Sequence, residues 1–127
     1  MFDDDDPYLE RVRKLCAGFP EADEKISHGR PAFFTKKVFV YYGGSHKNGD
    51  EWTEFPYAVM VQPDPGDRAA LLEDTRTFVP AYLGPSGWIG IVLDDKTDWS
   101  EITELFDASF RLTASKRAIT ALDARTP

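Results

Sequence analysis

The chain has few of the residues that build redox, metal and hydrolytic sites. Its 127 residues include one cysteine, Cys16, and two histidines, His28 and His46. A single cysteine excludes an internal disulfide and argues against an oxidising compartment. The sequence contains no HExxH motif, paired-cysteine spacing, GxSxG elbow or Walker loop. It therefore predicts no catalytic residue, no metal site and no cofactor, and we expect a protein that is not an enzyme.

Long apolar stretches are missing too. The longest, residues 88–93 and 57–61, fall far short of the roughly 18 residues that a membrane span needs. Residues 3–6 are four consecutive aspartates, the opposite of the basic start of a signal peptide. We therefore expect a cytoplasmic protein without membrane association.

Positive charge is scarce and unevenly distributed. The chain has 22 acidic and 15 basic residues, and its net charge of −7 argues against an indiscriminate binder of polyanions. Residues 25–48 nevertheless carry five basic residues and no acidic one, and residues 111–127 carry four basic residues and one acidic. Residues 49–110 hold 13 acidic and three basic residues. A polyanion would therefore be attracted to segments 25–48 and 111–127.

Material for a hydrophobic core is abundant. Hydrophobic residues make up 42% of the chain, and nine Phe, five Tyr and three Trp supply large side chains. This balance is typical of a folded globular protein. The length, with no internal repeat and no linker, predicts one domain over residues 1–127.

Helical spacing predicts a first helix near the N-terminus. Asp6 is suited to cap it, Pro7 fits its first turn, and Gly18 ends it. Cys16 lies on the apolar side of this helix, so we expect a buried thiol rather than a reactive one.

A second helical region lies near the C-terminus. Asp98, with Glu101 three residues later, predicts the start of a helix over about residues 99–113. A further helical stretch, residues 115–125, either continues that helix or breaks from it near Ala114.

Between the helical regions the pattern changes to short strands. Lys36 and Lys37 form a tight turn between two of them, and residues 43–55 are expected to be a mobile polar loop. Asp64 and Pro65 open a short crossover helix that reaches about residue 74. The predicted strands are residues 24–27, 32–35, 38–42, 56–62 and 88–93. This order predicts an α+β fold with an antiparallel sheet of about five strands.

Two aromatic residues are expected to fill the core between sheet and helices. Trp88 opens a run that is apolar on both faces, as in a strand covered on each side. Its indole should therefore pack against the helix over residues 99–113. We expect Tyr82 to lie in the same core.

The basic segment 25–48 also interleaves aromatic residues with its charges. Lysines beside exposed rings are typical of nucleic-acid binders, which place charges on phosphates and rings against bases. The alternative is that the rings face the core while the lysines are merely solvated. The rings concerned are Phe33, Phe34, Phe39, Tyr41 and Tyr42.

Four segments of the chain resemble the MmcQ/YjbR family. They are residues 15–22 (Leu-Cys, then Phe-Pro-Glu-Ala), 27–39 (Ser-His-Gly-Arg-Pro-Ala-Phe, then Lys-Lys-Val-Phe), 80–88 (Pro-Ala-Tyr-Leu-Gly-Pro-Ser-Gly-Trp) and 107–112 (Asp-Ala-Ser-Phe-Arg-Leu). The resemblance covers about residues 8–115. It implies a "double wing" α+β fold, similar to type III secretion chaperones, and a DNA-binding function by analogy of fold.

The resemblance and the charge pattern together favour DNA binding through a basic hairpin wing. The candidate nucleic-acid-binding residues are Lys25, His28, Arg30, Lys36, Lys37, Lys47, Arg111, Lys116 and Arg117. The alternative is a protein-interaction module, like a secretion chaperone, that receives a partner strand or helix on its sheet, for example near residues 38–42. A third hypothesis is a small-ligand pocket lined by His28, Arg30, Tyr82 and Trp88. Nothing in the sequence sets the oligomeric state.

Overall fold

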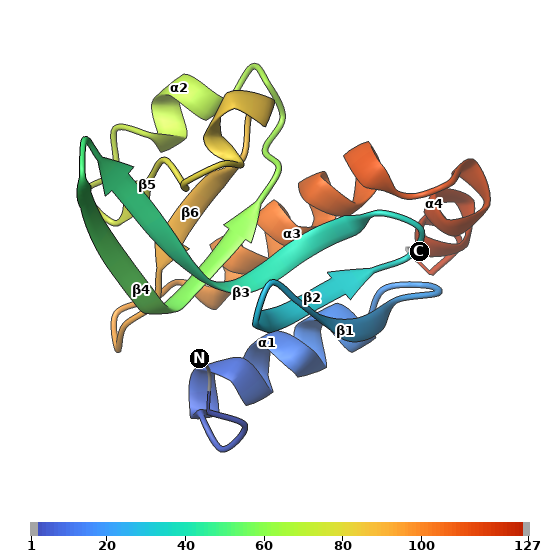
Figure 1. The fold of residues 1–127 in the computed structure, drawn as a ribbon. Coiled ribbons are helices and arrows are strands. Elements are labelled where there is room, and N and C mark those ends of the chain that lie inside the picture. Colours follow the sequence, from blue (N-terminus) through green and yellow to red (C-terminus); the bar gives the residue numbers. More distant parts are fainter. Residues whose placement is uncertain (1–2, 126–127) are drawn as a thin grey trace.

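The structure is a computed structural model in which residues 3–125 are described. From the N-terminus the elements are α1 (Pro7–Ala17), β1 (Asp23–Ser27), β2 (Arg30–Phe34), β3 (Val38–Asn48), β4 (Glu51–Val61), α2 (Arg68–Leu71), β5 (Thr77–Phe78), η1 (Gly84–Ser86), β6 (Ile89–Val92), α3 (Trp99–Thr113) and α4 (Lys116–Asp123). The strands form a six-stranded sheet in the order β1-β2-β3-β4-β6-β5, and each neighbouring pair is antiparallel (Figure 1). The predicted α+β class is confirmed, and the short strand β5 is added to the five expected.

The helix ends lie where their capping residues predict. Asp6 caps α1 by accepting a hydrogen bond from the Tyr8 backbone N–H at 2.9 Å. Asp98 caps α3 in the same way, accepting from the Ser100 N–H at 3.0 Å. The chain breaks after α3, and Ser115 caps a separate helix, α4. Of the two alternatives for the C-terminal region, the break is therefore the one that forms.

The prediction of a mobile loop over residues 43–55 is wrong. These residues extend β3 and β4 into a long hairpin whose turn is at Gly49 and Asp50. The register is irregular between Tyr42 and Gly44, which bends the ladder at that point. The segment is polar because both faces reach solvent near the hairpin tip, so it lacks the apolar alternation that marks a half-buried strand.

The crossover after β4 is also less regular than predicted. Its helix, α2, covers only Arg68–Leu71. Asp64 does not cap it; its carboxylate accepts from the Gly66 N–H at 2.9 Å within the preceding turn.

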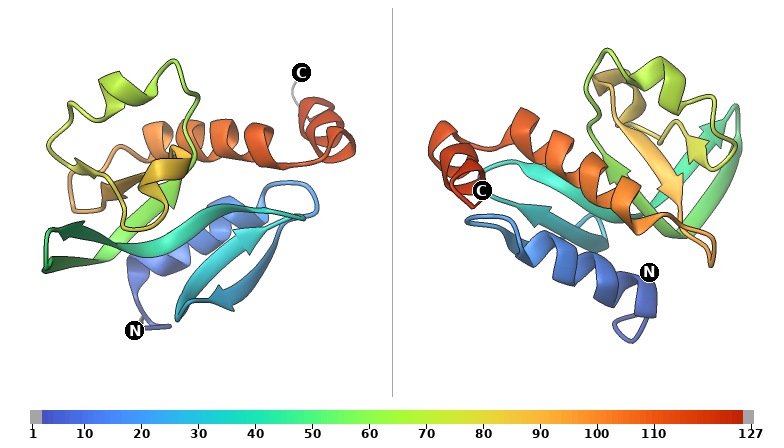
Figure 2. Two further views of the ribbon diagram at one scale, coloured as in Figure 1. Left: turned by 45° about the horizontal axis from the view of Figure 1, so that its top comes forward. Right: turned by 180° about the vertical axis from the view of Figure 1, so that it is seen from behind.

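One face of the sheet carries the main hydrophobic core. Helices α1 and α3 both cover this face, as the view from behind shows (Figure 2). Phe39 of β3 packs against Phe110 of α3 and Phe19, with ring centroids 5.3 and 5.5 Å away. Cys16 is buried in the same cluster, and burial raises the pKa of its thiol well above the usual value, so it remains protonated at neutral pH.

A buried hydroxyl fastens α3 to the centre of the sheet. Ser109 Oγ donates to the Phe39 carbonyl oxygen at 2.6 Å and accepts from the Gln62 N–H at 3.0 Å. One side chain thus satisfies a backbone group on β3 and another just beyond β4, which fixes how the helix lies across both strands.

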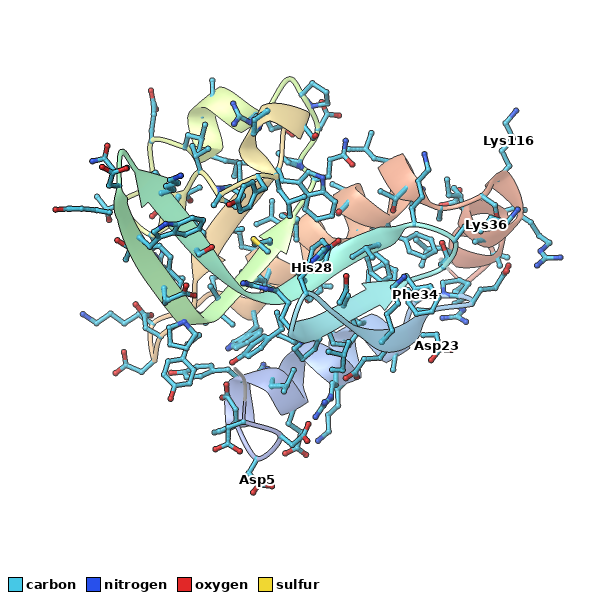
Figure 3. All side chains as sticks on the ribbon, viewed as in Figure 1. Asp5, Asp23, His28, Phe34, Lys36 and Lys116 are labelled. Atoms are coloured by element: carbon cyan, nitrogen blue, oxygen red, sulfur yellow. The ribbon has the colours of Figure 1, made fainter. Side chains whose placement is uncertain are left out.

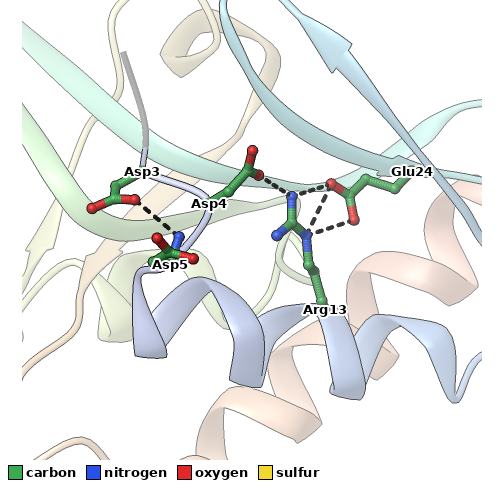
Figure 4. Close-up of polar contacts among 5 residues, drawn as sticks. All are labelled: Asp3, Asp4, Asp5, Arg13 and Glu24. Carbon is green, nitrogen blue, oxygen red and sulfur yellow. Dashed lines mark hydrogen bonds and ion pairs between the residues drawn. The ribbon is translucent and has the colours of Figure 1, made fainter.

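Two polar contacts fasten α1 to the sheet. The buried Tyr42 hydroxyl of β3 donates to the Asp6 carboxylate at the start of the helix. Further along, the Arg13 guanidinium binds Glu24 of β1 and Asp4 (Figure 4). The N-terminal aspartates therefore act through specific contacts as well as through the helix dipole.

The prediction that Trp88 packs against α3 is wrong, because Trp88 is buried on the opposite face of the sheet. Trp88 is buried, with 8% of its surface exposed, but its ring lies 5.5 Å from that of Tyr41. Tyr41 pairs with Met60, whereas the adjacent Val40 pairs with Val61 on the helix-covered face. Since successive residues of a strand point to opposite faces, Trp88 lies on the side away from α1 and α3.

Tyr82 is not a core residue at all. Its side chain is 81% exposed, and its backbone adopts a left-handed conformation with φ of 67°. Sequence spacing could not reveal this, because the position before η1 has no periodic pattern.

The hydrogen bond between Tyr42 and Asp6 predicts a loss of stability at alkaline pH. The pKa of Tyr42 lies far above its usual value of 10.0, mainly because the hydroxyl is buried and also because it is hydrogen-bonded to Asp6. This contribution to stability is complete below about pH 10, and it declines at higher pH as the tyrosine ionises in the unfolded chain. We expect Tyr42→Phe to lower the free energy of unfolding by about 1–3 kcal/mol at pH 7, because the buried Asp6 loses a partner. Urea denaturation from about pH 8 to 11 should show a shallower alkaline decline than in the parent protein.

The matched control is Tyr57→Phe, since 51% of Tyr57 is exposed. It should leave both the stability at pH 7 and the alkaline decline close to those of the parent. Equal behaviour of the two variants would contradict the proposed role of the Tyr42 hydroxyl.

Burial of Trp88 predicts that truncating this residue destabilises the fold. We expect Trp88→Ala to lower the free energy of unfolding by roughly 3–5 kcal/mol, the range for large aromatic residues in cores. Tyr82→Ala should change it by only about 0.5 kcal/mol, because the ring is exposed. Chemical denaturation measures both, and an unchanged midpoint for Trp88→Ala would refute the burial.

Candidate functional site

The face of the sheet away from α1 and α3, here called the outer face, is only partly covered. The ladder places Lys25, Ala32, Tyr41 and Met60 side by side across β1 to β4 on this face. The chain from β5 to η1 covers only the β6 end, as the views in Figure 2 show. Residues of this segment and of the β1–β2 turn line a hollow on the outer face.

That hollow, here called the outer cleft, has a volume of about 510 Å³. Tyr41 and Met60 of the sheet lie at its base. Its walls come from the β1–β2 turn, the far end of the β3–β4 hairpin, and the segment before η1. The lining residues are His28, Arg30, Tyr41, Ser45, Trp52, Glu54, Met60, Ala81, Tyr82 and Leu83.

Backbone contacts hold the wall formed by residues 79–83 in place. The Ala81 N–H donates to the Ser45 carbonyl oxygen at 2.8 Å, which attaches this segment to the end of β3. His46 Nδ1 lies 2.8 Å from the Val79 carbonyl oxygen, so this nitrogen carries the donated proton. His46 is therefore a structural residue of the wall.

Two exposed aromatic rings meet at the rim of the outer cleft. Trp52 from β4 and Tyr82 from the segment before η1 have ring centroids 5.8 Å apart. They are 46% and 81% exposed, and Lys47 places its ammonium group 5.3 Å from the Trp52 ring centroid. Rings this exposed contribute little to the core, so packing does not account for their position.

The β1–β2 turn brings two predicted site residues to the outer cleft. His28 adopts φ of 54°, a left-handed conformation at the tip of the turn, and Arg30 opens β2 beside it. Arg30 forms no ion pair with any carboxylate among residues 3–125, although Glu54 lines the same cleft. Of the four residues in the third hypothesis, the structure brings His28, Arg30 and Tyr82 together in the outer cleft. Trp88 lies outside the lining.

The predicted basic residues do not form a single surface. Lys36 and Lys37 occupy the β2–β3 turn, and Lys36 lies at the same end of the molecule as Lys116 of α4 (Figure 3). Lys25 lies on β1, the edge strand, with its ammonium group 4.7 Å from the Phe34 ring centroid. The candidates therefore divide between the outer cleft, the edge of the sheet and one end of the molecule.

Two predicted binding residues are occupied by carboxylates of the chain itself. Arg111 binds Asp107 at 2.6 Å and Asp123 at 2.8 Å, and these contacts raise the pKa of its guanidinium. Arg117 binds Glu21 at 2.8 Å, which lowers the pKa of that carboxyl. Neither guanidinium is free to neutralise a phosphate without breaking these pairs.

Most rings of the basic segment face the core, as the alternative interpretation holds. Phe33, Phe39 and Tyr42 are buried in the helix-covered cluster, and only Phe34 and Tyr41 belong to the outer face. The site residues that sequence reasoning missed are Trp52, Glu54 and Met60. A tryptophan in an otherwise polar stretch was the available signal for Trp52.

Within residues 3–125, no three His, Cys, Asp or Glu side chains lie close enough together to hold a metal ion. No helix described has both the length and the apolar character needed to cross a bilayer.

Comparison with solved structures identifies relatives in fold. The chain is similar to a protein from Pseudomonas syringae, with a TM-score of 0.63 and 14% identity over 83% of this chain and 97% of the other. It is also similar to the Deinococcus radiodurans protein DR2400, which has a DUF419 domain, with a TM-score of 0.62 and 17% identity over 91% and 87% of the two chains. At these identities the similarity establishes the fold alone. No curated protein matches the sequence significantly.

The family profile gives the decisive comparison. The profile of the YjbR family matches residues 17–112, which is most of the chain. The match includes three of the four segments that carry the resemblance, residues 27–39, 80–88 and 107–112, and all but the first two residues of the fourth, 15–22. The chain therefore belongs to the YjbR family.

Proposed function

We propose that this protein binds the phosphate backbone of nucleic acid through the basic end, defined as Lys36, Lys37 and Lys116. The observation that carries the proposal is that the β2–β3 turn and α4 lie at the same end of the molecule in every view (Figures 1 and 2). All three lysines are exposed, and none forms an ion pair with another residue in the range 3–125. They are available to neutralise phosphates.

One group of acidic residues lies far from the basic end. Asp94, Asp95 and Asp98 precede α3, whereas Lys116 follows it. Because α3 has 15 residues, its two ends are about 22 Å apart. Exposed charges are screened over about 8 Å at physiological salt, so this acidic cluster does not cancel the attraction of a phosphate to the basic end.

The basic end supports contacts with phosphates rather than with bases. Arg117, which binds Glu21, and Lys36 both lower the pKa of the Glu21 carboxyl, so part of the local positive charge is already balanced. The buried phenylalanines of the hairpin cannot stack on bases. We therefore expect salt-sensitive binding with little preference for sequence.

Reversing the two positive charges of the β2–β3 turn tests the proposal. Fluorescence anisotropy with a short labelled duplex, at several salt concentrations from about 50 to 200 mM, gives the affinity and its salt dependence. We expect Lys36→Glu/Lys37→Glu to weaken binding and to reduce the slope of log K against log salt by roughly 2, since two phosphate contacts are lost.

The matched control is Lys14→Glu/Lys96→Glu, which makes the same change in net charge at two exposed lysines elsewhere. It should bind more tightly than the turn variant. Absence of binding by the parent protein at low salt, or equal weakening by both double variants, would contradict the proposal.

The protein-interaction alternative requires a different surface from the one predicted. Residues 38–42 of β3 lie between β2 and β4, so they offer no free edge to a partner strand. Strand β1 is a free edge of the sheet that a partner strand could join, and it carries Ile26, which is 57% exposed.

Capture of a protein from nuclease-treated lysate tests this alternative. Under it, the captured protein is lost with Ile26→Asp and kept with Lys36→Glu/Lys37→Glu. Loss of all specifically captured material after nuclease treatment supports the nucleic-acid proposal instead.

A further inference from the structure

We propose that the outer cleft binds a planar aromatic ring that carries one anionic group, the chemistry of a nucleoside monophosphate. The site is distinct from the basic end and does not depend on it. It is formed where two segments that mark the family, residues 27–39 and 80–88, meet although they are far apart in the chain. The same chemistry is offered by a free nucleotide and by one residue of a single strand, and the experiment below separates these sources.

The aromatic part of the ligand is indicated by Trp52 and Tyr82. Their rings are tilted by 43° to each other at 5.8 Å and are largely open to solvent. Exposed aromatic rings on a cleft wall are the feature by which proteins stack nucleic-acid bases. Tyr41 and Met60 at the base of the cleft extend the apolar surface available to a ring.

Backbone strain supports a role for Tyr82 beyond packing. A bulky residue with φ of 67° is disfavoured, yet Tyr82 adopts this conformation and still leaves its side chain exposed. Hydrogen bonds on both sides hold it there: the Ala81 N–H donates to Ser45, and the Leu83 N–H donates to Ala81, each at 2.8 Å. Strain maintained without burial of the side chain is characteristic of ligand sites.

The anionic part is indicated by Arg30. Its side chain is half-buried, it makes no hydrogen bond or ion pair within residues 3–125, and its Nη1 lies 3.7 Å from where a Cβ of Gly43 would be. A guanidinium without a partner is a ready donor to a phosphate oxygen. His28 lines the cleft beside it and is a second donor.

Glu54 limits what the ligand can be. Its carboxylate lines the same cleft and would repel a dense polyanion such as a triphosphate. It is also an acceptor for an amino group on the ring. A second hollow of about 600 Å³ shares His28, Arg30 and Glu54 with the outer cleft, so a ligand with its anionic group at Arg30 has room on both sides.

Titration of the ¹⁵N-labelled full chain by NMR tests the proposal. The probes are the four nucleoside 5′-monophosphates, the corresponding nucleosides, inorganic phosphate and a short single-stranded oligonucleotide. We expect at least one monophosphate to shift the indole N–H of Trp52 and the amides of Arg30 and Tyr82, saturating below about 10 mM. Nucleosides and phosphate alone should bind roughly tenfold more weakly, because each lacks one of the two recognised parts.

Three variants locate the binding. Trp52→Ala and Arg30→Gln should each weaken the affinity for the monophosphate roughly tenfold or more, while Trp52→Phe retains most of it. The control Lys36→Glu/Lys37→Glu should leave the affinity of the outer cleft for the monophosphate unchanged, so failure at the basic end and failure at the outer cleft are distinguishable.

The source of the ligand follows from comparing the probes at the resonances of the outer cleft. Tighter binding of the oligonucleotide assigns the site to a single strand, and tighter binding of the monophosphate assigns it to a free nucleotide. If no probe shifts the resonances of the outer cleft in the parent protein, the proposal is wrong.

Discussion

The ring of Phe78 occupies a space on the sheet that only glycine leaves open, and the outer face is built around it. A Cβ at Gly90 would lie 2.1 Å from the ring, and one at Gly44 would lie 2.9 Å from it, closer than real Cβ atoms approach. Phe55 stacks on the Phe78 ring, with 4.1 Å between the two centroids. Because Phe78 is held in this way, the residues after it lie against the end of β3. Without this packing the outer cleft would lose one wall.

The two faces of the sheet therefore differ in role: one holds the main hydrophobic core, and the other carries the outer cleft. The helix-covered face carries the aromatic cluster around Phe39 and Phe110, together with the buried Ser109 that joins α3 to both central strands. The outer face has a small packed region around Phe78 and Trp88 and is otherwise open. Side chains that contribute little to stability, Tyr82 above all, are free to serve binding.

The parts of this structure that could be predicted are those governed by local rules. Asp6 and Asp98 cap their helices, and the β2–β3 turn at Lys36 is as expected, because caps and turns depend on neighbouring residues. The extended β3–β4 hairpin could not be predicted, because its register depends on Gly44 and on residues that follow much later. The same is true of the pairing of Arg117 with Glu21, which are 96 residues apart. Trp52 reaches the candidate site only through that hairpin, whereas His28 and Arg30 were recognisable from their turn.

The outer cleft forms in solution only if the β3–β4 hairpin and the segment before η1 lie close together. A nuclear Overhauser experiment between the Trp52 indole and the Tyr82 ring in the free protein tests it most directly. The structure predicts cross-peaks between the two rings, since their centroids are 5.8 Å apart. Absence of these cross-peaks, with Tyr82 resonances typical of an unstructured chain, would show that the outer cleft is not formed in the free protein.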